Sequence, residues 1–472
     1  MIRTTAKGDL TMPRPFSQAR DEQERDADEQ RATDLLVRVA PKVSGVAITF
    51  VDHSGAARIK VVPLPGLASA ARSGVGYSPV IDAFVSDGGI DPASPLDTPD
   101  GDLRMVPDLD QLVVLRDPEG WAWAPGDRFH QDGSVYANCQ RTFARAQVAA
   151  CLQRGISAQM AIEVEWMVGR DQEDFEPAFR GTGYGLSRFL EAADYVREVL
   201  ESLLAANVRV EQIHPEYGPA QFEVSVAAQD PVSAADTNVL VKLVIAAVTA
   251  RHGLRASFAP AVVTDNVGNG GHVHASFWRD GQSLLAGGNG RHGLTGAGES
   301  IMASLLTSLP ALLAIGAPSP SSYLRLQPSR WAGAFQIWGH ENREAAVRFV
   351  AGSAADPGAA NVELKCFDLS ANPYLLVGAV LAVALDGAGR LDSLPDEVIG
   401  DPAVPGHPLA GTAVRLPGSL AEALAALEAS EVLRAAAGDE LISTFAASRR
   451  AELALSDGKK DEDVIAHYRW LI

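Results

Sequence analysis

Short runs in which apolar and polar residues alternate predict β-strands in the first part of this chain. Residues 43–62 hold two such runs on either side of the turn-forming segment 52–55, so they predict a β-hairpin. Further strands are expected around 104–106 and 112–115. Together these runs predict a small β-rich domain that ends near residue 135.

A different spacing dominates further along, where apolar residues recur about every 3.6 positions and so share one face of a helix. The spacing is clearest at 187–206 and 234–251, which are expected to be helices that cover the core. A helix over 140–154 is expected to lead into a strand over 158–168. The segment 419–456 is also expected to be helical.

Three parts are predicted from these elements. Residues 1–30 are polar and rich in charge, which is typical of a disordered or frayed leader. The small β-rich domain takes residues 31–135, and a larger domain takes residues 136–472. Within the larger domain, the Pro- and Gly-rich segment 396–417 is expected to be a loop.

The composition is that of a soluble globular protein, with 472 residues of which 47% are hydrophobic and 21% charged. The net charge of −19 argues against nucleic acid and anionic membranes as partners, because both require a basic surface. Three cysteines without paired spacing indicate neither a disulfide framework nor a zinc site. No apolar signal segment is recognised, and the apolar run 374–385 is too short to cross a membrane, so a cytoplasmic location is expected.

Several strand-like runs carry polar residues two positions apart, with an apolar residue between them. Because side chains alternate across a strand, each run places its polar pair on one face. Exposed strand faces often carry Glu and His, which is the alternative for any one pair. Five carboxylates and an imidazole together call for a cation, and oxygen ligands favour Mg²⁺ or Mn²⁺. The candidates are Glu163, Glu165, Glu216, Glu223, His272 and Glu363.

The runs that hold these residues resemble, in the same order, the signature motifs of the glutamine synthetase family. They lie at 163–165, 216–223, 269–276, 342–348 and 361–374. The resemblance implies an α+β fold, in which a small N-terminal β-grasp domain precedes a catalytic domain with a curved antiparallel sheet covered by helices. It also implies a homo-oligomer, a dodecamer of two hexameric rings, with each active site between neighbouring subunits.

The resemblance further implies a role for each matching residue. One metal ion would lie at Glu165, Glu216 and Glu223, and a second, beside the phosphates of ATP, at Glu163, His272 and Glu363. The other matches are Arg343 and Arg348 for phosphate, His274 and Ser276 for the nucleotide, and Gly268, Arg325 and Lys365 for glutamate. In this family ATP phosphorylates the γ-carboxyl of glutamate, and an amine attacks the γ-glutamyl phosphate. Glu216 is the candidate base for that amine.

Two positions depart from the family members that use ammonium. Gly76 stands where those enzymes have an Asp, and Trp331 stands where they have a Glu. Losing two carboxylates removes most of the preference for a small cation, while a Trp can enclose an alkyl chain or bind an ammonium group on its ring face. These departures resemble the γ-glutamylamine ligases, which join glutamate to mono-, di- or polyamines. Tyr184 is expected to line the same pocket.

Further departures leave other questions open. Lys365 replaces an Arg and Val267 replaces an Asn that usually contact glutamate, so another acid stays possible as substrate. Asp392 stands at the place of a regulatory tyrosine, which argues against control by adenylylation. The preferred function is an ATP-dependent ligase for glutamate and an alkylamine, with polyamines favoured. An ammonium-using glutamine synthetase, an ethanolamine-type monoamine ligase and a non-catalytic relative are the alternatives.

Overall fold

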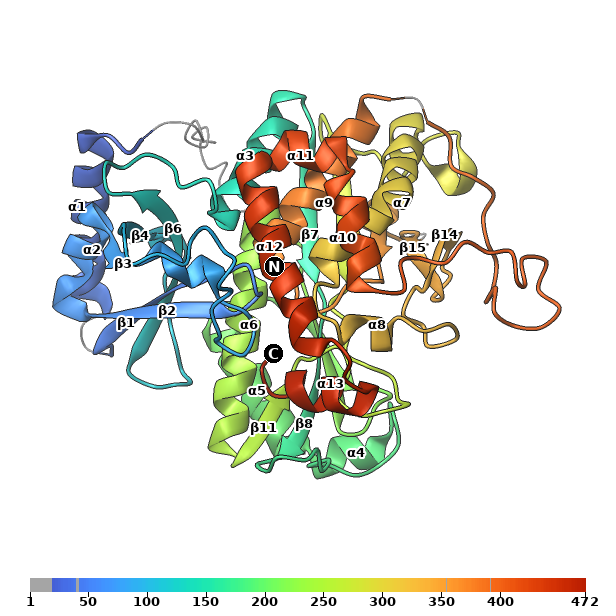
Figure 1. Cartoon of the computed structure of the whole chain (residues 1–472), viewed down its shortest axis with the longest axis horizontal. Helices are drawn as coiled ribbons and strands as arrows, with labels where there is room; N and C mark the ends of the chain where they lie inside the picture. The colour runs from blue at the N-terminus through green and yellow to red at the C-terminus, as the bar shows by residue number, and fades with distance from the viewer. Residues whose placement is uncertain (1–18, 40–41, 354, 391) are drawn as a thin grey trace.

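The computed structural model describes residues 19–39, 42–353, 355–390 and 392–472. Figure 1 shows a small N-terminal part at the left, built on a sheet with two helices at its outer edge, and a larger part that contains the remaining strands and helices. The C-terminal helices α12 (Asp439–Ser456) and α13 (Asp461–Tyr468) cross the front of the larger part.

The N-terminal sheet has the order β2-β1-β6-β4-β3, with β5 paired to β6. The hairpin predicted over 43–62 is confirmed, because β1 and β2 pair antiparallel from Gly45 opposite Pro63 to Val51 opposite Ala57. The strands are β1 (Gly45–Val51), β2 (Ala57–Pro63), β3 (Val75–Tyr77), β4 (Leu103–Pro107), β5 (Val113–Val114) and β6 (Trp121–His130). Short helices η1 (Leu64–Gly66), α2 (Leu67–Ser73), η2 (Pro79–Ala83) and η3 (Leu109–Gln111) connect them.

The expectation of a leader without regular structure up to residue 30 is wrong for its last part, because α1 is a helix over Glu22–Val39. Three of its acidic residues, although at least partly exposed, are paired: Arg72 of α2 forms ion pairs with Glu22, Asp26 and Glu29. Ala32 of the same helix is fully buried. The tertiary partner on α2 therefore orders a segment whose composition favours disorder. Residues 1–18 of the predicted leader lie outside the described residues.

Two sheets form the core of the larger part. One has the order β11-β8-β10-β9, and the other has the order β13-β12-β16-β15-β14 with β7 paired to β12. The strands are β7 (Ser157–Ile162), β8 (Val164–Arg170), β9 (Val210–Pro215), β10 (Gln221–Val226), β11 (Leu254–Ser257), β12 (Val273–Arg279), β13 (Gln282–Ser283), β14 (Phe335–His340), β15 (Ala345–Val350) and β16 (Asn361–Leu364).

Two details of these sheets correct the predictions. The strand expected over 158–168 is divided at Glu163, so that β7 belongs to one sheet and β8 to the other. The Glu163 backbone N–H still bonds to the carbonyl of His272, next to the end of β12, whereas from Val164 onward the chain pairs with β10. The sheets are also not wholly antiparallel, since β14 and β15 pair in parallel.

Helices cover the outside of these sheets. The expected helix over 187–206 is interrupted at Ala192, whose ψ of 6° is not helical, and forms α4 and α5. By length and apolarity α6 and α7 would suffice to cross a membrane, but their apolar windows are 67% and 78% buried, as in core helices. The helices are α3 (Gln140–Gln153), α4 (Leu186–Glu191), α5 (Ala193–Ala205), α6 (Pro231–Arg251), η4 (Arg291–Gly293), α7 (Gly296–Gly316), α8 (Ser322–Arg325), η5 (Pro357–Ala359), α9 (Pro373–Ala388), α10 (Leu420–Glu428) and α11 (Glu431–Ala437).

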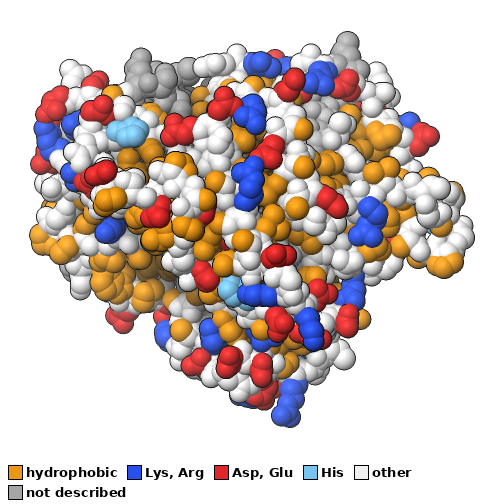
Figure 2. Space-filling model, in the orientation of Figure 1, with side chains coloured by type: hydrophobic (Ala, Val, Ile, Leu, Met, Phe, Trp, Pro, Cys, Tyr) orange, Lys and Arg blue, Asp and Glu red, His pale blue; other side chains and the backbone are white. Residues whose placement is uncertain are grey.

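The segment 396–417 contains neither helix nor strand within the part of the chain that the structure describes, as predicted, and extends as a loop at the right of Figure 1. On the same face, apolar side chains gather over the N-terminal part at the left (Figure 2). In the N-terminal part, β2 leaves Ile59 and Val61 54% and 49% exposed. Charged side chains of both signs are scattered over the rest of this face.

Candidate functional site

A cavity of about 1440 Å³ is lined by residues from both sheets of the larger part. With one exception, the residues predicted from the sequence line this cavity. They are Glu163, Glu165, Tyr184, Glu216, Glu223, Gly268, His272, His274, Ser276, Arg325, Trp331, Arg343, Arg348, Glu363 and Lys365. The exception is Gly76 of β3, which lies beside Asp102 and Arg104 in the N-terminal sheet. One chain by itself therefore does not bring Gly76 to the cavity.

The four-stranded sheet contributes a row of side chains that crosses three neighbouring strands. Glu165 on β8 lies opposite Glu223 on β10, and Glu223 lies opposite His214 on β9. Residues directly opposite one another in antiparallel strands point to the same face. The His214 Nε2 atom is 3.3 Å from Glu223 Oε1. This row forms one wall of the cavity.

The second sheet contributes a matching row. His274 on β12 lies opposite Glu363 on β16, and Glu363 lies opposite Arg348 on β15. Arg348 Nη1 donates a hydrogen bond of 3.0 Å to Glu363 Oε2. Lys365, two residues after Glu363 and just past the end of β16, places its Nζ 3.1 Å from the other oxygen of Glu363. Positive groups therefore surround the carboxylate on this side.

Glu163 joins the two rows, because it lies where the chain passes from β7 to β8. Its Oε1 is 2.9 Å from His272 Nδ1, and His274 Nε2 is 3.6 Å from its Oε2. The division of the predicted strand at this residue is therefore what places Glu163 between the sheets. Alternation along one continuous strand would have kept it in a single sheet.

The electrostatics of the two rows differ. Burial raises the pKa of Glu165 to about 7 against the opposing charge of Arg325, and burial also raises the pKa of Glu223 to about 7. For Glu363, burial opposes ionisation, but the charges of Lys365, His274 and His272 together outweigh it and the pKa falls to about 2. At His274, burial lowers the pKa, but the hydrogen bond to Glu163 and the negative charges of Glu363 and Glu163 together outweigh it and raise the pKa of that imidazole to about 9. The carboxylates of the first row thus lack sufficient compensating positive charge.

Three groups of side chains at the cavity have ligand atoms that lie within 4.8 Å of one another, as a metal site requires. They are Glu163 with His272 and Glu363, Glu163 with Glu165 and Glu223, and His214 with Glu216 and Glu223. Oxygen donors dominate all three, and crowded buried carboxylates are stabilised by a divalent cation. The donor set therefore fits Mg²⁺ or Mn²⁺.

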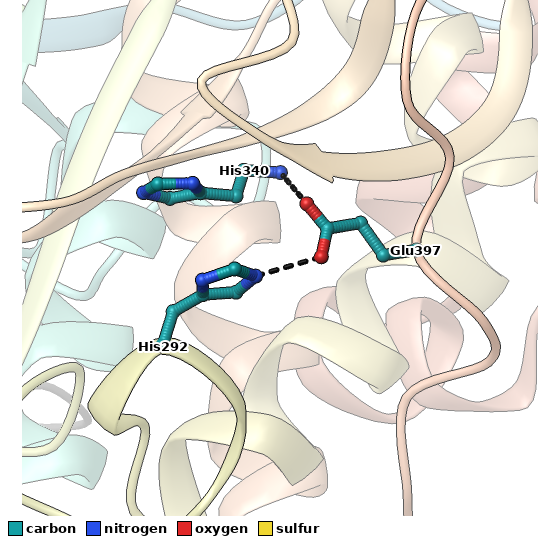
Figure 3. A group of neighbouring side chains, drawn as sticks. All are labelled: His292, His340 and Glu397. Atoms are coloured by element: carbon teal, nitrogen blue, oxygen red, sulfur yellow. Dashed lines mark hydrogen bonds and ion pairs between the residues drawn. The ribbon is translucent and has the colours of Figure 1, made fainter.

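A fourth group with the same spacing lies away from the cavity and does not fit an ion in the same way. The rings of His292 and His340 are stacked at 4.1 Å with an interplanar angle of 14°. Nitrogen lone pairs lie in the ring plane, so two nearly parallel rings cannot both point at one ion. Both oxygens of Glu397 already accept hydrogen bonds, from His292 Nε2 and from the backbone N–H of His340 (Figure 3). This group is a structural latch.

A cationic pocket for an acid lies beside the metal-compatible groups. Arg325 is 5% exposed, and its Nη2 donates to His272 Nε2 at 3.0 Å. Its Nη1 has no hydrogen-bond partner among the described residues although it is buried. A buried guanidinium nitrogen of this kind calls for an anionic partner. Gly268 lines the same place, and a Cβ there would stand 1.7 Å from the carbonyl oxygen of Pro260, so the loop requires glycine.

The arginines predicted to bind phosphate differ in their surroundings. Arg348 is held by Glu363 and by Glu341, whose Oε2 accepts from Nη2 at 2.7 Å. Arg343 is exposed at the cavity and forms no ion pair with any residue the structure describes. On the nucleotide side, His274 Nδ1 is 2.9 Å from Asn361 Oδ1, and Ser276 Oγ accepts from Trp278 Nε1 at 3.0 Å.

Aromatic residues line another part of the cavity, next to Glu216. The hydroxyl of Tyr184 is 2.7 Å from both oxygens of Glu216. Trp331 is 62% exposed and has a φ of 55°, in the left-handed region that a non-glycine residue rarely adopts. Tyr217 is also exposed here. The part predicted to receive the amine thus includes exposed aromatic rings, and the hydroxyl of Tyr184 contacts Glu216 there.

Sequence reasoning assigned no role to several polar residues of the cavity, and three of these contact predicted site residues. His214 pairs with Glu223, Asn361 contacts His274, and Gln221 Nε2 donates to Glu165 Oε2 at 3.0 Å. The signal for His214 and Gln221 was present, because each lies two positions from a predicted ligand and so shares its strand face. For Asn361 the same spacing to Glu363 applies.

Comparisons with known proteins identify the family of this chain. The family model described as glutamine synthetase, catalytic domain, matches residues 137–467. Gamma-glutamylpolyamine synthetase GlnA3 of Streptomyces coelicolor is 49% identical over 449 residues, 93% of this chain and 96% of that protein.

Solved structures agree as well. A crystal structure described as a novel glutamine synthase homolog has a TM-score of 0.82 at 31% identity, covering 91% of this chain and 99% of that one. A GmaS complex with ADP has a TM-score of 0.80 at 27% identity, covering 91% and 97%. The resemblance predicted from the motifs and the predicted α+β fold are confirmed by these matches.

Proposed function

We propose that this chain, which belongs to the glutamine synthetase family and is an ATP-dependent ligase, joins the γ-carboxyl of glutamate to an alkylamine, with polyamines favoured. The observation that carries this proposal is the composition of one cavity. It keeps every predicted metal ligand, whereas its amine part presents Trp331 where ammonium-using members of the family have a carboxylate. The gamma-glutamylpolyamine synthetase that is 49% identical supports the same substrate class.

The chemistry that we propose uses the two rows of side chains described above. Two divalent cations, one at Glu165, Glu216 and Glu223 and one at Glu163, His272 and Glu363, would neutralise negative charge on the triphosphate. Arg343 and Arg348 bind the phosphoryl oxygens, since a guanidinium matches their geometry. A γ-carboxylate oxygen of glutamate attacks the γ-phosphorus of ATP and ADP leaves, which gives γ-glutamyl phosphate.

In this proposal the acid substrate is held by its α-carboxylate, at the opposite end from the γ-carboxyl group that reacts. The unpartnered Nη1 of Arg325 supports a role in binding the α-carboxylate, and Gly268 leaves space for it. Lys365 adds charge nearby but already contacts Glu363, so Arg325 supplies most of the recognition. We propose glutamate as the acid because these groups lie on the same cavity as the phosphate-binding arginines.

The amine completes the reaction. An alkylamine resembling the Lys side chain has a pKa around 10 and must lose a proton before it attacks. Glu216 is our candidate for the base, because it faces Tyr184 in the aromatic part of the cavity. The amine nitrogen then attacks the acyl carbon, phosphate leaves, and the amide forms. Trp331 excludes water from the acyl phosphate and contacts the alkyl chain in this proposal.

The test is ADP release that depends on glutamate and Mg²⁺, measured across ammonium, ethanolamine, putrescine, cadaverine, spermidine and spermine, with products identified by mass. We expect a γ-glutamyl product with the di- and polyamines and little product with ammonium. Product with ammonium alone would make this chain a divergent glutamine synthetase. Product with ethanolamine alone would assign a monoamine ligase.

We also propose that the active site lies between neighbouring subunits of a homo-oligomer. Gly76 supports this, because it resembles an amine-site residue of the family yet lies away from the cavity of its own chain. The exposed apolar residues of β2 give the N-terminal sheet a surface that a second copy can cover. Mass photometry measures the assembly, and a monomer that is active at nanomolar concentration would contradict this arrangement.

A further inference from the structure

The loop that carries Trp331 has an unusual backbone. Ser329 and Trp331 have φ values of 58° and 55°, and both are non-glycine residues in the left-handed region. Each such residue costs of order 1 kcal/mol or more, and it persists only where the surrounding structure determines it. The loop therefore has a specific shape that other residues impose, and it is not a free flap.

Glu344 is the first of the residues that impose this shape. Its Oε1 accepts a hydrogen bond of 3.0 Å from the backbone N–H of Ser329, and its Oε2 accepts one of 2.9 Å from the backbone N–H of Trp331. The carboxylate is 4% exposed, so these bonds are shielded from water. Because the two donors belong to the two left-handed residues, a single carboxylate fixes both.

The strap, defined as residues 395–401, provides a second contact to the loop. Asp401 at its end accepts a hydrogen bond of 2.6 Å from the hydroxyl of Ser329. The latch of Glu397, His292 and His340 ties the start of the strap to β14 and to η4 (Figure 3). Asn342 ties its middle, since Nδ2 donates to the carbonyls of Val398 and Gly400 at 2.9 Å.

Glu344 does not itself line the cavity, whereas Trp331 and the neighbouring Arg343 do. It therefore stands behind the loop rather than beside a substrate. Asn342 also accepts a hydrogen bond from the backbone N–H of Glu344 at 3.0 Å, so the strap and the carboxylate share an anchor. Loss of either contact would free Trp331 without removing any group that touches the reactants.

We propose that Glu344 is a positioning residue that sets the choice of amine by holding Trp331 in its left-handed conformation. Asp401 of the strap supports the same loop through its hydrogen bond with Ser329. The proposal rests on the proposed function, because it concerns the amine part of the same cavity. It goes beyond that function in assigning amine selectivity to two carboxylates that do not contact the amine.

The experiment compares Glu344→Ala, Glu344→Gln and Asp401→Asn with the wild type. The first readout is trypsin cleavage at Arg330, inside the loop, with fragments identified by mass. The second is kcat/KM for spermidine or putrescine relative to ammonium, together with KM for ATP and glutamate. Glu176→Ala, which removes an exposed carboxylate paired with Arg170, is the control. Thermal unfolding confirms that each variant is folded.

We expect Glu344→Ala to be cleaved faster at Arg330 and to lose at least about tenfold in the amine selectivity ratio, since hydrogen bonds to a charged group are lost. KM for ATP and glutamate should stay within about twofold of the wild type, because a purely structural defect would move all three. Glu344→Gln keeps one acceptor and should be intermediate, and Asp401→Asn should give a smaller change in the same direction.

Unchanged cleavage would contradict the proposal that Glu344 holds the loop of Trp331. Faster cleavage with unchanged selectivity would contradict the role of Glu344 in the choice of amine. If Glu344→Ala does not fold, Glu344→Gln and Asp401→Asn decide the matter by the same two readouts. A wild type that uses no alkylamine at all would defeat the proposed function instead. In that case the cleavage assay would still show whether Glu344 holds the loop. Failure of the proposed function can therefore be distinguished from failure of the role proposed for Glu344.

Discussion

Single residues at the cavity show which interactions the reaction depends on. Burial among other carboxylates raises the pKa of Glu165 to about 7 despite the charge of Arg325. Arg343 is exposed at the same cavity and has no ion pair among the described residues, so its charge is free to meet a phosphate. Glu165 belongs to the proposed metal site, and Arg343 belongs to the proposed phosphate site.

Glu165→Ala and Arg343→Ala should each lower the kcat of glutamate-dependent ADP release by about a hundredfold or more, because each removes a group that stabilises charge in the transition state. Glu176→Ala, on an exposed loop, is the matched control and should not change kcat. Circular dichroism should show that all three variants are folded. Activity within about threefold of the wild type in either site variant would contradict the site assignment.

Trp331→Glu combined with Gly76→Asp should move preference toward ammonium. The two changes return carboxylates to the amine site, where they favour a small cation and shorten the apolar pocket. The measurement is the ratio of kcat/KM for ammonium to that for spermidine, which should rise about tenfold or more. Trp331→Phe keeps an apolar ring and is the control. An unchanged amine profile in the double variant would mean that one of the two positions is misassigned.

At the scale of elements, helix α3 contacts both the N-terminal part and the larger part through the side chain of Arg141. Arg141 of α3 is 3% exposed and pairs with Asp236 of α6, with Asp127 of β6 and with Asp108 before η3. Tyr374 at the start of α9 also donates to Asp236, at 2.7 Å. The packing of α3 against both parts thus depends on a buried guanidinium with three carboxylate partners.

Arg141→Met should lower the free energy of unfolding by about 3 to 5 kcal/mol, because it leaves the buried Asp236 carboxylate without its cationic partner. Urea denaturation followed by circular dichroism measures the change. Arg154→Met just after the same helix is the control, since the Arg154 side chain makes, among the residues that the structure describes, a single long hydrogen bond of 3.5 Å to the carbonyl of Leu385. A change at Arg141 no larger than that at Arg154 would show that the network is not needed.

At the scale of the whole molecule, the hairpin turn between β1 and β2 is a further contact between the N-terminal part and the larger part. Asn372 at the start of α9 donates to the carbonyls of Val51 and Asp52, at 3.0 Å and 3.1 Å. His53 in this turn is 1% exposed and contacts Gln140 of α3. Burial lowers the pKa of His53 to about 4, although the nearby Asp82 opposes the change.

This shift predicts a pH dependence of stability. Between pH 6.5 and about 4 the unfolded chain binds a proton at His53 that the folded protein does not bind, so the free energy of unfolding falls as the pH falls through this window. The full effect is about 3 kcal/mol. His53→Asn should have a flatter stability curve between pH 6.5 and 5, measured by thermal unfolding, whereas His130→Asn, which removes an exposed imidazole, should follow the wild type. Parallel curves for His53→Asn and wild type would contradict the prediction.

Much of this architecture follows from local pattern. The hairpin, the helices near 140–154 and 234–251, and the loop at 396–417 were predicted because strand alternation, helical spacing and turn residues act over a few neighbouring positions. The metal-compatible residues were predicted in the same way, since positions two apart on a strand share a face. Contacts between distant segments were not accessible to this reasoning.

The sequence by itself determined the family, the fold class and which side chains face the cavity, because these depend on local alternation and on the order of motifs. Only the tertiary structure decided the division at Glu163 between two sheets, the helix over Glu22–Val39 and the support of Trp331 by Glu344. Each of these rests on a partner remote in the chain. In the sequence alone, a Glu can equally lie on an exposed surface or be a buried hydrogen-bond acceptor. The positions of its hydrogen-bond donors in the fold decide between the two.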